Sequence, residues 1–229
     1  MSAKMNFIVG DSRVRGFKGV FSTLEVANVW SRPGGKIEHM ANGIEDMTIL
    51  HHGENNERAH FYIWVGICNL TKKLRGRDYE EVIFSQDDVA LNRERWYAEL
   101  QRLALHTKNQ YAAPIFLPIY SMNLEKWNQH RLSIKKTKTL KYSEQYATMQ
   151  KQLEEEVDIF NNQLIELNLE NGVKTPMVHQ DFHHSRGKGR ATPRYGELAD
   201  GCHPSLALRK KFKKSIMTTL KKNKTLQRA

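Results

Sequence analysis

Three residues near opposite ends of the chain have the side chains that nucleophilic catalysis needs. Ser12 follows an apolar run that ends at Gly10, where a serine acts either as a helix cap or as a nucleophile. The local sequence does not separate these two roles. Near the other end, Asp200 and His203 lie three residues apart across a glycine, so one turn can carry an acid and a base together. A serine nucleophile needs such a base, and the base needs an acid to set its tautomer.

Each of these residues also has an ordinary structural explanation. An Asp-Gly pair such as Asp200-Gly201 is a common turn, and a histidine before a proline, such as His203, is a common loop residue. The combination with Ser12 favours catalysis, provided that the fold brings the two ends of the chain together.

The pattern of apolar residues predicts strands that alternate with helices. Short apolar runs that end near glycine or proline are typical of buried strands, and they occur at 5–9, 26–30, 61–67, 113–120 and 176–182. Apolar residues at helical spacing predict helices over 36–47, 86–108, 142–169 and 205–221. This alternation predicts a parallel sheet with helices on both faces.

Three polar or glycine-containing loops follow the first three predicted strands. They are Gly10-Asp11-Ser12, Pro33-Gly34-Gly35 and the stretch from Gly66 to Asn69. Because ligands of such sheets bind beyond the carboxyl ends of the strands, we expect the three loops to share one rim.

The two end motifs, Gly10-Asp11-Ser12 and Asp200-Gly201-Cys202-His203-Pro204-Ser205, resemble those of the SGNH hydrolase superfamily, also called GDSL esterases and lipases. The resemblance implies an α/β fold, a three-layer α/β/α sandwich around a five-stranded, mainly parallel, flavodoxin-like sheet. It implies a domain over 1–208, followed by a basic helix and tail over 209–229. The implied activity is hydrolysis of a small, acetyl-like acyl ester through an acyl-enzyme, with no cofactor.

By this resemblance Ser12 is the nucleophile, His203 is the general base and Asp200 orients the base. The oxyanion is expected to be held by the backbone N–H of Ser12 and that of Gly34, with Gly35 as the alternative. Glycine lets a backbone approach a substrate closely.

The third sequence block of the superfamily is altered in this chain. It usually reads Gly-x-Asn-Asp, and its asparagine is an oxyanion donor, whereas here the stretch reads Gly66-Ile67-Cys68-Asn69. An ungapped match places Cys68 where the donor amide belongs. Either the loop presents Asn69, or one donor is missing, which typically costs about a hundredfold to a thousandfold in rate.

Further residues of these loops are predicted to line the substrate site. Arg13 follows the serine and can attract an anionic group of the substrate, although as an exposed helix residue it can also have no role. The full set predicted to contact substrate is Asp11, Arg13, Gly35 and Cys68.

The charge distribution supports a second hypothesis. The chain has 36 basic and 25 acidic residues, and the segment 209–228 has nine basic and no acidic residues. A solvated basic helix explains this segment, but so does a surface that binds phosphate backbones. The alternative function is therefore a catalytically weak or inactive SGNH-like module that binds RNA or DNA through Arg209, Lys210, Lys211, Lys213 and Lys214. Both functions can also be combined, in an esterase domain that is tethered to nucleic acid or carried by a virus or mobile element.

Composition argues against several other classes of protein. No apolar run approaches the length of a membrane span, and the N-terminus lacks a secretory signal, so we expect an intracellular protein, cytoplasmic or nuclear. Two cysteines are too few for a disulfide framework. The histidines at 51–52 and in the stretch 178–184 have no Cys-x-x-Cys partner, so no metal site is predicted.

Overall fold

The computed structural model describes residues 6–22, 26, 28–50, 59–111, 113–134, 138–184 and 192–226, and the histidines at 51–52 lie outside these ranges. Its strands are β1 (Asn6–Asp11), β2 (Asn28–Arg32), β3 (His60–Trp64), β4 (Thr71–Arg75), β5 (Glu80–Phe84), β6 (Ile115–Phe116), β7 (His183–His184) and β8 (Thr192–Pro193). Its α-helices are α1 (Met40–Leu50), α2 (Ile67–Leu70), α3 (Gln86–Gln110), α4 (Leu124–Ser133), α5 (Tyr146–Glu170), α6 (Val178–Asp181) and α7 (Leu206–Leu226). Short 3₁₀ helices are η1 (Ser12–Gly19), η2 (Ile37–His39), η4 (Ser143–Gln145) and η5 (Tyr195–Glu197).

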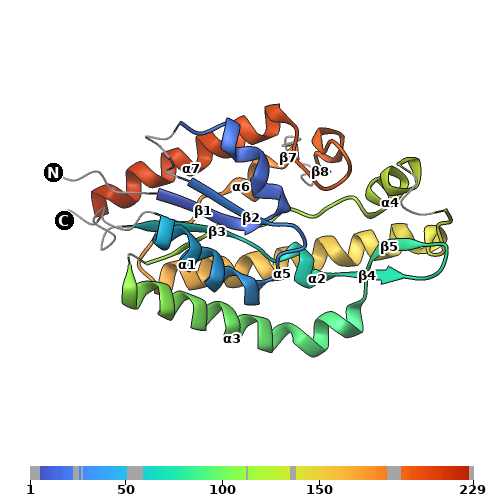
Figure 1. Cartoon of the computed structure of the whole chain (residues 1–229), viewed down its shortest axis with the longest axis horizontal. Coiled ribbons are helices and arrows are strands. Elements are labelled where there is room, and N and C mark those ends of the chain that lie inside the picture. The colour runs from blue at the N-terminus through green and yellow to red at the C-terminus, as the bar shows by residue number, and fades with distance from the viewer. Residues whose placement is uncertain are drawn as a thin grey trace.

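The central sheet is parallel and has the order β2-β1-β3-β6 among the described residues. Helices α1, α3 and α5 lie on one side of it and α7 lies on the other, which gives the predicted α/β/α sandwich (Figure 1). Since all strands of this sheet run the same way, the loops after β1, β2 and β3 meet at one edge. No helix within the described ranges has the length and apolarity to cross a bilayer.

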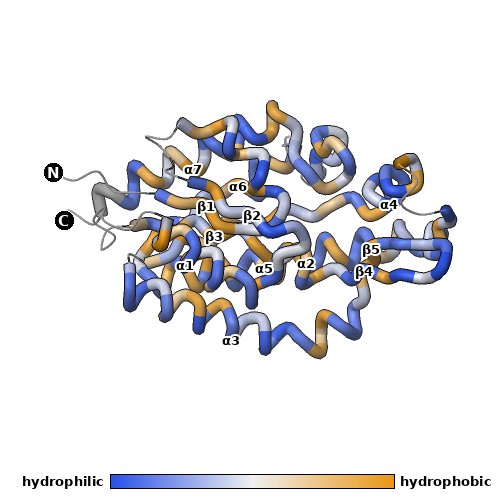
Figure 2. Tube along the Cα trace, viewed as in Figure 1, coloured by the Kyte–Doolittle hydropathy of each residue, from blue (hydrophilic) through white to orange (hydrophobic). Residues whose placement is uncertain are grey.

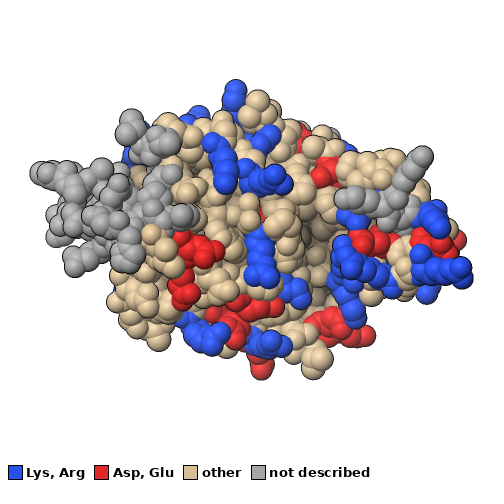
Figure 3. All heavy atoms as spheres, viewed as in Figure 1, with Lys and Arg blue, Asp and Glu red and all other residues tan. Residues whose placement is uncertain are grey.

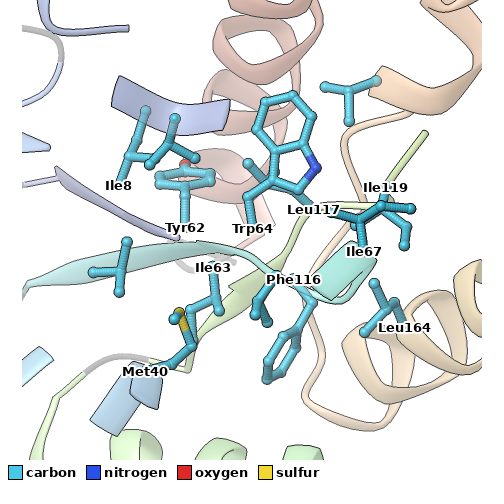
Figure 4. Close-up of a cluster of buried hydrophobic side chains, with 14 of the residues drawn as sticks. Ile8, Met40, Tyr62, Ile63, Trp64, Ile67, Phe116, Leu117, Ile119 and Leu164 are labelled. Carbon is cyan, nitrogen blue, oxygen red and sulfur yellow. The ribbon is translucent and has the colours of Figure 1, made fainter. Parts of the chain in front are cut away.

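Both faces of the sheet are covered by apolar side chains, as the continuous apolar runs predicted. Trp64 of β3 packs against Phe212 of α7, with ring centroids 5.4 Å apart, whereas Phe61 packs against Tyr111 on the other face, at 5.3 Å. In Figure 4, Tyr62 and Trp64 point to one side of β3 and Ile63 points to the other. Figure 2 shows hydrophobic residues along the inner strands of the sheet, whereas the tip of the β4–β5 hairpin consists of hydrophilic residues.

The predicted fifth strand at 176–182 is wrong, because this stretch contains the helical turn α6. Asparagine side chains of α5 take the place of a strand beside β6. Asn168 accepts a hydrogen bond from the N–H of Phe116 at 2.8 Å and donates to its carbonyl at 2.7 Å. Asn161 likewise accepts a hydrogen bond from the N–H of Ile119 at 2.7 Å and donates to the carbonyl of Ile119 at 2.8 Å. These amides satisfy backbone groups that a neighbouring strand would otherwise pair.

Replacing Asn168 with leucine should therefore destabilise the protein strongly. Asn168 is fully buried, and leucine leaves the N–H and C=O of Phe116 without partners, at about 1–3 kcal/mol for each buried group. Urea unfolding should show a loss of about 2–5 kcal/mol. The exposed neighbour Asn162 is the matched control, and Asn162→Leu should stay within about 0.5 kcal/mol of the wild type. Equal losses in the two variants would contradict this account of the sheet edge.

Other boundaries also differ from the prediction. The strand predicted at 26–30 lies at 28–32, and only residues 115–116 of the predicted strand 113–120 pair with β3. The β4–β5 hairpin and α4 were not predicted. The turn residues Gly76, Arg77 and Asp78 between two alternating segments were the available signal for the hairpin.

Helix α7 is continuous from Leu206 and buries Leu208, Phe212, Ile216 and Leu220 against the core. The predicted domain boundary between 208 and 209 therefore lies inside α7. In Figure 1, α7 runs beside the sheet that contains β1, so segments from the two ends of the chain pack together.

Candidate active site

Ser12 lies at the bend between β1 and η1, held by a buried ion pair. Asp11 caps η1 by accepting a hydrogen bond from the N–H of Arg13 at 3.0 Å. The Arg13 guanidinium binds the same carboxylate, with Nη2 at 2.6 Å from Oδ2, and both side chains are 1% exposed. Burial disfavours the charge on Arg13, but the Asp11 carboxylate more than compensates and raises the pKa of Arg13. Neither Asp11 nor Arg13 is placed to meet a substrate, contrary to the expectation that Arg13 is exposed.

His203 lies in a tight loop that precedes α7. The N–H of Ala199 donates to the carbonyl of His203 at 2.8 Å, which closes the loop around Gly201. Gly201 has a φ of 92°, and a Cβ there would lie 2.5 Å from the backbone nitrogen of Trp127. Glycine adopts a positive φ without strain and has no Cβ to clash with Trp127. Gly201 therefore allows the loop to pack against the first turn of α4.

Ser12, His203 and Asp200 form one hydrogen-bonded chain. His203 Nε2 is 3.0 Å from Ser12 Oγ, and His203 Nδ1 is 2.6 Å from Asp200 Oδ2. The predicted convergence of the two ends of the chain is therefore confirmed. The other Asp200 oxygen accepts hydrogen bonds from the N–H groups of Cys202 and His203 at 3.0 and 2.8 Å. Burial opposes ionisation of Asp200, yet the hydrogen bonds from the His203 ring and the two backbone N–H groups prevail and lower its pKa to about 2.

The predicted oxyanion donors have distinct hydrogen-bonding states. The N–H of Gly35 donates to the carbonyl of Arg32 at 2.9 Å, so it is occupied within its own turn. Gly34, which is exposed and has a φ of 67°, donates no hydrogen bond to another described residue. Of the two glycines, Gly34 is thus the one with a backbone donor to offer.

The altered third block places Asn69 in α2, which begins after Gly66. Asn69 is 7% exposed, and its Oδ1 accepts a hydrogen bond from the N–H of Ile37 at 3.1 Å. This bond joins the block to the loop after β2 and fixes the orientation of the amide. Asn69 Nδ2 is buried and has no hydrogen-bond partner among the described residues. A buried amide N–H of this kind is an unused donor.

A buried contact that was not predicted joins the Ser12 bend to the His203 loop. Arg13 lies over the ring of Tyr120, with Cζ 5.3 Å from the centroid, and its Nη1 is 3.4 Å from the carbonyl of Tyr120. The Tyr120 hydroxyl donates to the carbonyl of Cys202 at 2.9 Å. Ser12 is the sequence neighbour of Arg13, and His203 is the sequence neighbour of Cys202. The contacts through Tyr120 therefore link the backbone segments that position Ser12 and His203.

Both cysteines are free thiols of low reactivity. Burial, helped by the charge of Asp11, raises the pKa of Cys68 to about 12. Burial also raises the pKa of Cys202, which is 7% exposed. Because the thiolate is the reactive form of cysteine, neither thiol is activated as a nucleophile.

Much of the basic segment is used within the chain. Arg209 Nη1 donates to the carbonyl of Gly16 at 2.8 Å, Lys213 Nζ donates to that of Val20 at 3.0 Å, and Lys211 pairs with Glu197 at 3.1 Å. Lys210 and Lys214 are exposed on α7. Within the described ranges, no group of three or more His, Cys, Asp or Glu side chains is arranged to hold a metal ion.

Comparison of the structure with solved structures gives matches over nearly the whole chain. One is a variant of an acetyl xylan esterase from Geobacillus stearothermophilus, with a TM-score of 0.57 and 14% identity, covering 95% of this chain and 94% of that one. Another is a GDSL-like lipase from Bacteroides thetaiotaomicron, with a TM-score of 0.57 and 11% identity over 99% and 89% of the two chains. A third is a member of the lipolytic G-D-S-L family from Veillonella parvula, with a TM-score of 0.53 and 14% identity over 93% and 97%.

Comparison of the sequence gives no match to a protein-family model or to a curated protein. Two of these structural matches are described as GDSL proteins, the group that the motifs at Ser12 and His203 resemble. The chain has the SGNH hydrolase fold.

Proposed function

We propose that the protein is a serine hydrolase of the SGNH type that cleaves a carboxylic ester through an acyl-enzyme. The observation that carries this proposal is the contact of 3.0 Å between His203 Nε2 and Ser12 Oγ, in a histidine whose other nitrogen is 2.6 Å from Asp200. Because Nδ1 carries the proton that it donates in a hydrogen bond to the Asp200 carboxylate, Nε2 carries none and faces the serine hydroxyl as an acceptor.

In the proposed reaction, Ser12 Oγ attacks the carbonyl carbon of the ester while His203 Nε2 takes the serine proton. His203 then gives this proton to the oxygen of the departing alcohol as the carbon–oxygen bond breaks. A water molecule attacks the acyl-serine, with His203 again accepting a proton, and the acid leaves as Ser12 regains its hydrogen. Asp200, ionised, stabilises the imidazolium that forms in each step.

Three donors are proposed to hold the oxyanion: the backbone N–H groups of Ser12 and Gly34 and the Nδ2 of Asn69. The unpartnered Nδ2 of Asn69 and the uncommitted N–H of Gly34 support this assignment. Donors that are fixed before the reaction stabilise the developing charge without reorganisation. We thus assign to Asn69 the donor role that the ungapped match places at Cys68.

The proposed acyl group is small, and acetyl is the simplest candidate. An acetyl xylan esterase shares the fold over most of both chains, which supports this choice. A series of p-nitrophenyl esters from acetate to octanoate tests it, and kcat/KM should be highest for acetate. A fluorophosphonate probe should label the peptide that contains Ser12. Failure to hydrolyse any of these esters, together with no labelling, would overturn the proposed function.

Changing Asn69 to alanine should lower kcat by about a hundredfold to a thousandfold with little change in KM, because an oxyanion donor acts mainly in the transition state. Fluorophosphonate labelling should slow in parallel, since its adduct also carries a charged oxygen. Asn42→Ala, at an exposed position on α1, is the matched control. A loss below about fivefold in a folded Asn69 variant would exclude its amide as a donor.

A further inference from the structure

A groove of about 770 Å³ is lined by α5, α7 and the segment that joins α5 to α6, and no residue of the triad lies in it. Its apolar side chains come from α5 and the joining segment, and they are Ile165, Leu169, Val173 and Met177. Its basic side chains come mainly from α7, and they are Lys174, Lys211, Lys214 and Lys222. A groove of this volume is large enough for a small organic ligand.

The apolar wall of the groove is open to solvent. Leu169 is 77% exposed and Met177 is 39% exposed, whereas Val173 is buried. Ile165 lies one turn before Leu169 on α5, so the two side chains share one face of the helix. Neighbouring apolar side chains that stay exposed commonly mark a binding site, because water solvates such a surface poorly.

The lysines outnumber the acidic groups of the groove. Asp181 is the one carboxylate among the described residues that line it, and it accepts a hydrogen bond from the hydroxyl of Ser215. Lys211 pairs with Glu197 at 3.1 Å. The other three lysines are exposed and form no ion pair with a described carboxylate, and they are Lys174, Lys214 and Lys222. Their charge is available to an anionic ligand.

Basic side chains also gather around α7 outside the groove. Figure 3 shows lysine and arginine side chains in the upper part of the molecule, where Figure 1 places α7. The positive potential of such a surface attracts anions, and a low-dielectric wall strengthens the field inside a groove. The groove therefore suits a ligand that is anionic at one end and apolar along the rest.

The two ends of the groove differ in charge. Lys174 is held beside Lys222 by the next residue of α7, because Asn223 accepts a hydrogen bond from the N–H of Lys174 at 2.8 Å and donates to its carbonyl at 3.2 Å. Asp181 lies toward the other end, since it bonds to Ser215, seven residues before Lys222 and thus about 10 Å away along α7. An anion is favoured at the end with the paired lysines.

We propose that this groove binds a single anionic amphiphile, a carboxylate with an alkyl chain of medium length. The carboxylate binds between Lys174 and Lys222, and the chain covers Leu169, Val173 and Met177. Burial of the chain removes apolar surface from water on both partners, and the lysines supply charge-assisted hydrogen bonds. A nucleic acid would use the lysines and leave the apolar wall uncovered, whereas a membrane surface binds a protruding apolar face.

Titration calorimetry with octanoate and with the uncharged octanamide tests both parts of the site. Octanoate should bind more tightly, and its affinity should fall as NaCl is raised from 50 to 500 mM, whereas that of octanamide should not fall. From hexanoate to decanoate, each added methylene should tighten binding by about twofold to fourfold, because the chain gains apolar contact. An affinity that does not change with chain length would overturn the inference.

Variants of the groove locate the ligand. Lys174→Gln and Lys222→Gln should each weaken octanoate binding by about twofold to fivefold at low salt and leave octanamide binding unchanged. Leu169→Asp should weaken the binding of both ligands by about fivefold or more. The matched controls are Lys210→Gln, at an exposed position of α7 outside the groove, and Leu91→Asp, at a position of α3 that is 83% exposed. Both controls should bind like the wild type.

Other results would overturn the inference. Equal losses in the control variants would mean that only net charge or surface polarity matters, and unchanged octanoate binding in both lysine variants would place the ligand elsewhere. Oligouridylate or phosphatidylglycerol vesicles that bind through Lys174 and Lys222, with no binding of octanoate, would identify a phosphate-binding surface in place of the amphiphile site. Ser12→Ala should bind octanoate like the wild type, since Ser12 lies outside the groove, so this result does not depend on the proposed hydrolase activity.

Discussion

With Ser12 replaced by alanine, we expect ester hydrolysis to fall by a factor on the order of 10⁵ or more and fluorophosphonate labelling to disappear. The variant lacks the oxygen that is proposed to form the acyl-enzyme, and His203 then has no serine proton to accept. The fold should be unaffected, since the Ser12 hydroxyl makes its hydrogen bond to the partly exposed His203 rather than to the core. Steady-state kinetics, mass spectrometry of the labelled protein and a thermal melt measure these effects.

Ser143→Ala is the control for this substitution, because Ser143 is exposed at the start of η4. Its activity and labelling should match those of the wild type. Residual activity of Ser12→Ala within tenfold of the wild type would show that another group is the nucleophile. Retention of the label at another residue would have the same meaning.

The second large effect is expected for Asp200→Asn, which should lower kcat by about 10⁴-fold while Ser12, His203 and their backbones stay in place. The asparagine amide can donate to His203 Nδ1, and this favours the tautomer with the proton on Nε2, which cannot accept the serine proton. Asp158→Asn, at an exposed position on α5, is the matched control. A loss of only a few-fold would mean that Asp200 shapes the loop and does not set the tautomer.

The same substitution changes how stability depends on pH. Asp200 has a pKa of about 2 in the folded protein, below the value of about 3.9 for an aspartate in an unfolded chain. Ionised Asp200 therefore stabilises the fold above about pH 4, and this contribution is lost as the pH falls toward 2. Urea unfolding between pH 2.5 and 5 should show a shallower fall in stability on acidification for Asp200→Asn than for the wild type. Parallel curves would contradict the lowered pKa.

The buried contacts around Arg13 connect the Ser12 bend to the His203 loop. Asp11 and Tyr120 hold Arg13 from opposite parts of the fold, and Tyr120 also bonds to the loop of His203. A buried ion pair costs desolvation, which its mutual attraction and additional hydrogen bonds offset when the geometry is good. Here the contacts of Arg13 with Asp11 and Tyr120 hold together the Ser12 bend and the His203 loop, which are distant in sequence.

The sequence by itself determined the layered architecture and the residues of the hydrogen-bonded triad. Parallel strands buried on both faces must be continuously apolar, and long amphipathic helices must repeat every three or four residues, so β1, β3, α3 and α5 are visible in the local pattern. Ser12, Asp200 and His203 were visible because each lies in a short motif with a fixed order of residue types.

Only the tertiary structure decided the features that depend on contacts between distant segments. Local sequence does not reveal that Asn161 and Asn168 replace a fifth strand, because an asparagine in a helix is ordinarily a surface residue. Likewise, nothing near Arg13 in the chain predicts its burial beneath Tyr120, and nothing near Trp127 places it beside His203. The tertiary structure also decided the orientation of the Asn69 amide, because Asn69 Oδ1 accepts a hydrogen bond from the N–H of Ile37 in η2, more than thirty residues earlier in the sequence. Burial and pairing are properties of the packed chain, and residue types constrain them only in part.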